Sequence, residues 1–93
     1  MAIYAISYDL NSPGQKYDRM KQAIESCGES IKPMESYWFV DSSLTAAEVS
    51  RRVRQVHDAN DRHFVQAVTT GHQGWLSQEV CNWLNQRQHK LAA

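Results

Sequence analysis

The hydrophobic pattern of the chain begins with an unbroken run of β-branched, aromatic and small residues over residues 2–9. In a strand, successive side chains point to opposite faces. One face would then carry Ile3, Ala5 and Ser7, and the other Tyr4, Ile6 and Tyr8. Both sets are fairly apolar, so the pattern predicts a central strand rather than an edge strand.

A helix is predicted directly after this strand. Ser12 and Gln15 have the spacing of a capping box, and Pro13 suits the first helical position. One apolar stripe then follows at steps of three and four residues, formed by Tyr17, Met20, Ile24 and Cys27. Gly28 marks the end of the predicted helix.

The middle of the chain repeats these signals. A short, weak strand, ESIKPM, precedes a stronger one, SYWFVD, whose aromatic and β-branched residues are typical of a buried strand. Thr45 and Glu48 form a second predicted capping box. The helix that they open carries Val49, Val53 and Val56 on one face and Arg51, Arg52 and Arg54 on the others.

A further strand, HFVQAV, is followed by the turn TTGHQG and by a helix over about residues 76–90. The order strand–helix–strand–strand–helix–strand predicts a ferredoxin-like βαββαβ domain of the α+β class with an appended C-terminal helix. Such a domain has an antiparallel sheet with two helices on one face. We expect one domain over residues 1–93, with its core at about residues 2–70.

Composition changes this picture in two ways. Ninety-three residues with 42% hydrophobic content allow one core, and a domain of this size is only marginally stable, so we expect self-association as a homodimer. Ten basic and ten acidic residues give no net charge, so long-range attraction to phosphate should be weak. Binding to DNA or RNA would need a local basic patch or a symmetric dimer.

The cysteines and the absence of long apolar runs predict the cellular location of the protein. Cys27 and Cys81 each fall at an apolar helical position; one disulfide is an alternative, but buried free thiols are the favoured interpretation. No signal peptide and no run of about 20 apolar residues is visible, so we expect a cytoplasmic protein that does not enter a membrane.

Asp9 is the first candidate for chemistry, because it closes the first predicted strand. Two interpretations stand side by side. A carboxylate before Asn-Ser-Pro-Gly is typical of a turn or helix cap. Alternatively, two such carboxylates from two chains could meet across a two-fold axis and bind a divalent cation, which one carboxylate alone holds poorly.

Several segments together resemble a known family. YAISYDLN with its following helix, ESYWFV, LTAAEV and NDRHFVQAV are similar to the small dimeric CRISPR-associated protein two. The similarity is greater still to its SinR-like relatives, which carry Y-D-L-N-x-P-G-Q-x-Y and S-x-W-F-V segments. The resemblance spans roughly residues 3–68.

The resemblance implies a ferredoxin-like protomer, a symmetric dimer and a functional aspartate at the position of Asp9. In the CRISPR branch this aspartate binds Mg²⁺ or Mn²⁺ for a metal-dependent nuclease activity, and the protein also serves as a structural subunit in spacer acquisition. Ser36 and Phe39 fall where that branch has its S-x-F segment, but here Trp38 stands beside Phe39. The chain departs from that branch beyond residue 70, where a helix is predicted instead of a fifth strand, and the SinR-like relatives generally lack an assigned activity.

Basic side chains of the two predicted helices form the second candidate site. If both helices cover one sheet face, these side chains could bind the phosphates of a nucleic acid. The alternative is an ordinary solvated helix surface balanced by acidic neighbours. The residues are Lys16, Arg19, Arg51, Arg52 and Arg54.

Two further groups complete the candidates. His57, Asp58, Asp61 and His63 fall around one loop, where two imidazoles and a carboxylate could hold a transition metal, or where all four are ordinary loop residues, with Asp61 as a cap or turn contact. Trp75, Leu76, Val80 and Trp83 form an apolar patch that either packs in the core or docks onto a partner or a second copy.

Two functions follow as hypotheses. The first is a dimeric, nucleic-acid-associated protein, a metal-dependent endonuclease if catalysis is retained, with Asp9 as its metal ligand. The second is a non-catalytic module from a phage or mobile element that keeps the fold and binds a protein partner. A weaker third is a ribonuclease that pairs Asp9 with a hydroxyl of Tyr8 or Ser36.

Overall fold

The computed structural model describes residues 1–11 and 16–93. The predicted cap residues Ser12, Pro13 and Gln15 lie outside the described residues. In chain order the elements are β1 (Ala2–Asp9), α1 (Lys16–Glu25), β2 (Glu29–Met34), β3 (Tyr37–Ser42), α2 (Ala46–Arg54), β4 (Arg62–Ala67), α3 (Gln78–Asn85) and a 3₁₀ helix at Gln88–Lys90.

The strands form one four-stranded sheet in the order β2-β3-β1-β4, and all neighbouring strands are antiparallel. The central position of β1 is confirmed. Because β1 and β2 both run antiparallel to β3, they are parallel to each other with β3 between them. The protein is therefore a small α+β structure with an antiparallel sheet, and its strand order is compatible with the predicted ferredoxin-like arrangement.

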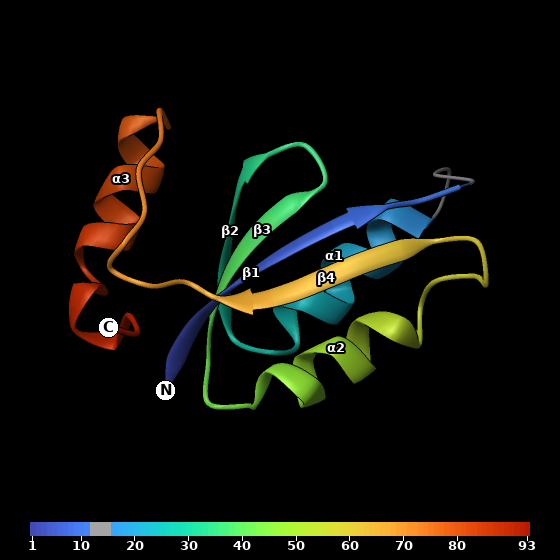
Figure 1. Ribbon diagram of the computed structural model, residues 1–93. Helices are drawn as coiled ribbons and strands as arrows, with labels where there is room; N and C mark the ends of the chain where they lie inside the picture. Colours follow the sequence, from blue (N-terminus) through green and yellow to red (C-terminus); the bar gives the residue numbers. More distant parts are fainter. Residues whose placement is uncertain (12–15) are drawn as a thin grey trace.

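Helices α1 and α2 lie side by side on one face of the sheet (Figure 1). The capping box of α2 is confirmed: the Glu48 backbone N–H donates to Thr45 Oγ1 at 3.2 Å, and the Thr45 N–H donates to Glu48 Oε1 at 2.9 Å. The core beneath the helices contains one set of alternating β1 residues, as predicted. It comprises Tyr4, Ile6, Tyr8, Leu10, Met20, Ile24, Cys27, Trp38, Val40, Val49 and Val53.

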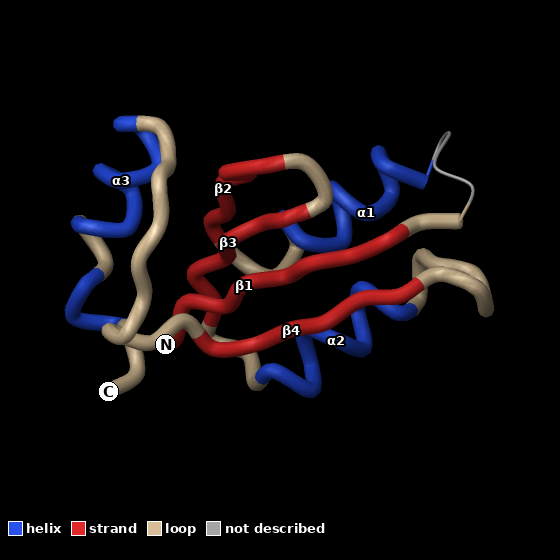
Figure 2. Tube along the Cα trace, turned by 45° about the horizontal axis from the view of Figure 1, so that its top comes forward, coloured by secondary structure: helices blue, strands red, loops and turns tan. Residues whose placement is uncertain are grey.

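Among residues 1–11 and 16–93, the opposite face of the sheet is covered only toward the end where α3 lies (Figure 2). There Ile3, Ala5 and Phe39 pack against Val68, Val80 and Leu84. Farther along, Ser7 pairs with Tyr37 on one side and Phe64 on the other, and Ala5 pairs with Gln66. Directly paired residues share a face. We call this uncovered surface the open sheet face; it consists of Ser7, Met34, Tyr37, Phe64 and Gln66.

The C-terminal segment is attached to the sheet by charge as well as by apolar packing. The buried carboxylate oxygen Oδ2 of Asp41 accepts hydrogen bonds from Arg87 Nε at 3.1 Å and from Lys90 Nζ at 2.7 Å. Arg87 also pairs with Glu29 at 2.6 Å, and its guanidinium carbon lies 3.9 Å from the centroid of the Trp83 ring. These contacts fix α3 on its own sheet.

The last predicted helix runs from Gln78 to Asn85 and is followed by a separate 3₁₀ helix, rather than continuing to residue 90. The Arg87 N–H donates to the carbonyl of Leu84, three residues back, while its side chain reaches Asp41. This tighter turn separates the two helices. Among the described residues, no helix is both long and apolar enough to span a membrane.

Candidate functional site

Asp9 is exposed at the end of β1, on the same face of the sheet as Ser7 and the rest of the open sheet face. Its cross-strand neighbour is Arg62 of β4. The Arg62 guanidinium donates to the backbone carbonyls of Ala59 and Asp61, at 3.4 and 3.1 Å. Among the described residues, no hydrogen bond or ion pair engages the Asp9 carboxylate.

A shallow pocket of about 220 Å³ surrounds Asp9, lined by Ser7, Tyr8, Asp9, Arg62, His63 and Phe64. It combines one carboxylate with an aromatic ring and one arginine. Within residues 1–11 and 16–93, no three His, Cys, Asp or Glu side chains lie close enough to hold a metal ion together. One protomer thus supplies one carboxylate, which does not by itself fit the octahedral oxygen coordination of Mg²⁺.

Asp61 has a different role from Asp9, because its side chain is fully buried. Its Oδ1 accepts a hydrogen bond from the Asn11 backbone N–H at 2.7 Å, and its Oδ2 accepts one from the Asp58 N–H at 2.7 Å. Lys16 Nζ lies 3.1 Å from Oδ2. The hydrogen bonds from Asn11 and Asp58 and the charge of Lys16 lower the pKa of Asp61 from 3.8 to about 2. The predicted turn contact ahead of β4 is confirmed, and it extends to the segment after Asp9.

The predicted phosphate-binding residues belong to α1 and α2, which cover one face of the sheet (Figure 1). Asp9 lies on the other face, because the preceding residue Tyr8 packs beneath these helices. Lys16 is largely enclosed and pairs with Asp58 at 2.5 Å and with Asp61. Arg52 donates to the Ser26 carbonyl at 2.8 Å, and Arg54 donates to the His57 carbonyl at 3.1 Å. These contacts give three of the five basic residues protein partners.

A groove between α1 and α2 nevertheless brings Arg19 and Arg52 together. Its volume is about 410 Å³, and its lining contains no carboxylate: Arg19, Gln22, Ala23, Ser26, Arg52, Gln55 and Val56. Arginines and neutral donors without a nearby carboxylate suit a phosphate group. Arg51 is exposed one residue before Arg52.

The hydroxyls considered for a ribonuclease lie elsewhere. The Tyr8 hydroxyl is on the helix side of β1, where it accepts a hydrogen bond from Trp38 Nε1 at 3.1 Å. Burial raises the pKa of Tyr8. Ser36 occupies the turn between β2 and β3 with a φ of 56°, and its carbonyl accepts from the Tyr8 N–H at 3.1 Å. Asp9 and the Tyr8 ring therefore point to opposite faces of the sheet.

The apolar C-terminal patch divides into two parts. Val80 is buried at 3% exposure, Leu76 is partly buried, and Trp83 stacks on Phe39 with ring centroids 6.3 Å apart, so these three residues pack within the chain. Trp75, by contrast, is 99% exposed.

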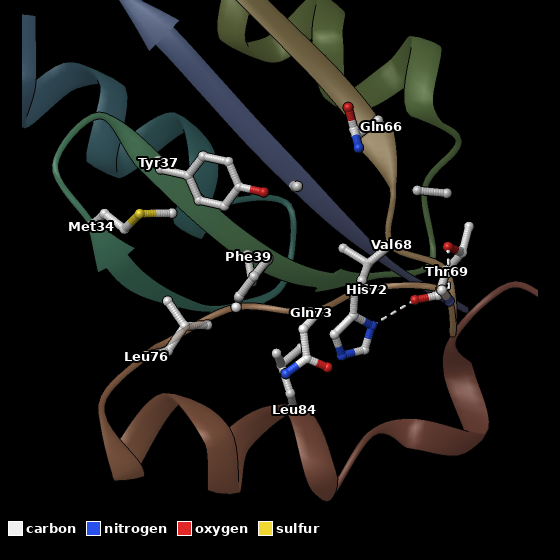
Figure 3. Close-up of a pocket in the computed structure, with 14 residues that line it drawn as sticks. Met34, Tyr37, Phe39, Gln66, Val68, Thr69, His72, Gln73, Leu76 and Leu84 are labelled. Atoms are coloured by element: carbon white, nitrogen blue, oxygen red, sulfur yellow. Dashed lines mark hydrogen bonds between the residues drawn. The ribbon is translucent and has the colours of Figure 1, made fainter.

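A second pocket lies where the open sheet face meets α3, and its volume is about 260 Å³ (Figure 3). Met34, Tyr37 and Phe39 line it from the sheet, and Leu76 and Leu84 line it from the C-terminal segment. The connecting segment adds polar groups, including His72, whose Nδ1 lies 2.7 Å from the Thr69 carbonyl. The pocket is continuous with the open sheet face, with which it shares Met34, Tyr37 and Gln66.

The histidines around the predicted loop form a hydrogen-bonded chain with a helix serine. Ser50 Oγ lies 2.7 Å from His63 Nε2, and His63 Nδ1 lies 2.8 Å from His57 Nε2. His57 Nδ1 lies 2.9 Å from the Asp58 carbonyl. The sequence pattern indicates the two histidines but not Ser50. A signal that could have pointed to Ser50 is its position on the flank of a helix that faces an edge strand.

Comparison with known proteins adds information on the fold. No protein-family model matches the chain, and no curated protein sequence is detectably similar to it. Among solved structures, it is similar to a hypothetical protein, TT1823, from Thermus thermophilus. That match has a TM-score of 0.60 and 19% sequence identity, and it covers 82% of this chain and 94% of the other. The similarity therefore supports the fold and gives no information on activity.

Proposed function

We propose that the protein is a homodimer of ferredoxin-like protomers that acts on nucleic acid, with the two Asp9 carboxylates sharing one divalent cation, Mg²⁺ or Mn²⁺. The observation that carries the proposal is the position of Asp9. It is exposed at the border of the open sheet face, and no protein group among the described residues engages its carboxylate. Asp61, in contrast, is buried and accepts backbone hydrogen bonds from Asn11 and Asp58.

The dimer is supported by the apolar side chains of the open sheet face. Phe64 is 63% exposed and Met34 is 50% exposed, and the partly buried Tyr37 lies between their strands. A second copy packed on this face would bury them, and isologous contact is the commonest arrangement of soluble dimers. Because Asp9 lies next to Phe64 on this face, a two-fold axis near this end would bring the two carboxylates together.

Paired carboxylates repel each other when the site is empty, so a divalent cation would be bound more strongly than by one carboxylate. If held by the two Asp9 carboxylates, such an ion would supply a bound water molecule and stabilise the charge that develops on a phosphodiester. Asp9 would hold the ion, and Phe64 would limit access of bulk water at the edge of the interface. The Arg19–Arg52 groove would bind phosphates on the outer layer of each protomer.

A cleavage assay tests this function. Wild-type protein and Asp9→Asn would be incubated with single- and double-stranded DNA and RNA in Mn²⁺, Mg²⁺ or chelator. Asp18→Asn, which removes another exposed carboxylate on α1, is the matched control. Cleavage that requires metal, is lost in Asp9→Asn and persists in Asp18→Asn supports the proposal. Equal cleavage by Asp9→Asn and wild type, or no cleavage by any folded protein, contradicts it.

A second function, a non-catalytic module that binds a protein partner, is favoured by one observation. Trp75 is almost completely exposed, and it precedes the α3 segment that borders the open sheet face. Tryptophan is enriched where interfaces concentrate their binding energy. Under this function, Trp75→Ala weakens capture of a partner and Asp9→Asn does not.

We also propose a cytoplasmic location. Its support is the pair of cysteines, which are both free thiols in the structure, with Cys27 buried beneath α1.

A further inference from the structure

The hydrogen-bonded chain at the edge of the sheet begins at His57 Nδ1, which lies 2.9 Å from the Asp58 carbonyl oxygen and 3.4 Å from Arg54 Nη1. In the tautomer that satisfies the shorter contact, His57 Nδ1 donates to the Asp58 carbonyl and Arg54 donates to the His57 carbonyl, so His57 Nε2 is an acceptor in the neutral ring. His63 Nδ1 must then donate to His57, which leaves His63 Nε2 as an acceptor. Ser50 therefore donates its hydroxyl proton to His63.

This arrangement matches the geometry of an activated nucleophile: a hydroxyl within hydrogen-bonding distance of a base, and the base oriented by a third group. We propose that Ser50 is a nucleophile for acyl transfer from carboxylic esters, with His63 as its general base and His57 as a positioning residue. This site lies on the helix side of the sheet, and the proposal does not rest on the function proposed for Asp9.

The surroundings of the chain favour this chemistry. Ser50 on α2 and His63 on the edge strand β4 are both half-buried, and their side chains are in hydrogen-bonding contact. Burial lowers the pKa of His63, and the positive charge of the nearby Arg54 lowers it further. His63 is therefore a neutral acceptor at pH 7. Among the described residues, no carboxylate pairs with either imidazole ring. The carboxylate of the neighbouring Asp58 binds Lys16 instead.

Arg54 supplies positive charge near the nucleophile. It follows Ser50 by four residues, so the two side chains lie on the same side of α2. Its guanidinium is held by the His57 carbonyl at 3.1 Å. From this position it can stabilise the negative charge that develops on the ester carbonyl oxygen during attack.

The reaction balances without an added cofactor. Ser50 Oγ forms a bond to the carbonyl carbon while its proton passes to His63 Nε2, and the resulting imidazolium donates through Nδ1 to His57 Nε2. The bond from the carbonyl carbon to the leaving oxygen then breaks, and His63 returns the proton to that oxygen. Water attacks the acyl-serine, gives its proton to His63, and releases the carboxylic acid as Ser50 regains its proton.

Covalent labelling of the full-length protein tests the proposal. Diethyl 4-nitrophenyl phosphate phosphorylates activated serines, and intact mass spectrometry with peptide mapping locates the modified residue. We expect labelling on Ser50, its loss in Ser50→Ala, and a rate lower by roughly a hundredfold in His63→Gln. Ser43→Ala and His72→Gln, which alter an exposed serine and an exposed imidazole outside the chain, should label like wild type.

Hydrolysis of 4-nitrophenyl acetate separates the role of His57 from a purely structural one. In His57→Gln, the glutamine side-chain oxygen can still accept the hydrogen bond from His63, so covalent labelling of Ser50 persists. The midpoint of the pH–rate profile for ester hydrolysis nevertheless shifts. In His57→Ala, labelling falls. No modification of folded wild-type protein, modification spread over lysines and tyrosines, or equal labelling of Ser50 in wild type and His63→Gln would overturn the proposal. Circular dichroism of each variant establishes that it is folded.

Discussion

The carboxylate of Asp61 accepts a hydrogen bond from the backbone N–H of Asn11 at 2.7 Å, across fifty residues of sequence. This bond joins the loop before β4 to the segment that follows Asp9. Lys16 forms an ion pair with the same carboxylate. The end of β1, where the proposed site lies, is therefore positioned by a buried acid that does not itself face the site.

Substitution of Asp61 should destabilise the fold. Asp61→Ala leaves the N–H groups of Asn11 and Asp58 without their acceptor, and leaves Lys16 partly enclosed with one carboxylate fewer. We expect the melting temperature to fall by about 5–10 °C. Thermal unfolding followed by circular dichroism measures this, with Asp18→Ala as a control for removing an exposed acid. A melting temperature equal to wild type would contradict the assignment.

The same carboxylate predicts a dependence of stability on pH. Its folded-state pKa lies below the unfolded value of 3.8, at about 2, so its stabilisation is complete well above 3.8 and is lost as the pH falls toward 2. The difference in urea midpoint between wild type and Asp61→Asn should be constant from about pH 7 to 5 and shrink below about pH 4. A difference that instead grows on acidification would show that another group is responsible.

Gly28 is predicted to tolerate no side chain. Its φ is 155°, and a Cβ placed there would lie 1.9 Å from the Asp41 carbonyl oxygen, which is backbone and cannot move aside. Gly28→Ala should reduce the free energy of unfolding by about 2–4 kcal/mol. Gly74→Ala is the matched control, because a Cβ there meets nothing within 4 Å. Urea denaturation of both variants makes the comparison, and equal stability would be inconsistent with the close approach.

Two residues of the apolar C-terminal patch should behave in opposite ways. Val80 is buried against the sheet, so Val80→Ala should cost about 1–3 kcal/mol of unfolding free energy. Trp75 is exposed, so Trp75→Ala should change stability by less than about 0.5 kcal/mol. Chemical denaturation measures both. A large loss in Trp75→Ala, at a concentration where the protein is monomeric, would show that Trp75 packs within the chain.

The features that were predictable from sequence are those set by neighbouring residues. The alternation in β1 separated its two faces correctly, and the Thr45–Glu48 box placed the start of α2, because both depend on contacts within a few positions. The hairpin was shifted by one residue: Ser36 takes a positive φ in the turn, so β3 begins at Tyr37.

Features that depend on distant pairing were not predictable. Asp41 was assigned only as a strand residue, yet it binds Arg87 and Lys90, which are 46 and 49 residues away. Similarly, the two histidines were noted from the sequence, but their contact with Ser50 depends on how the loop after α2 folds back onto β4. Such contacts are fixed by strand order and helix packing, which a single sequence does not specify.

The most direct test of the central claim is the stoichiometry of Mn²⁺ binding, measured by isothermal titration at a concentration where light scattering reports the dimer. Two Asp9 carboxylates that share one ion predict half an Mn²⁺ per chain for wild type and none for Asp9→Asn. Phe64→Glu, which places a charge on the open sheet face, should give a monomer that binds no Mn²⁺. Monomeric wild-type protein, or Mn²⁺ binding that is unchanged in Asp9→Asn, would contradict the account.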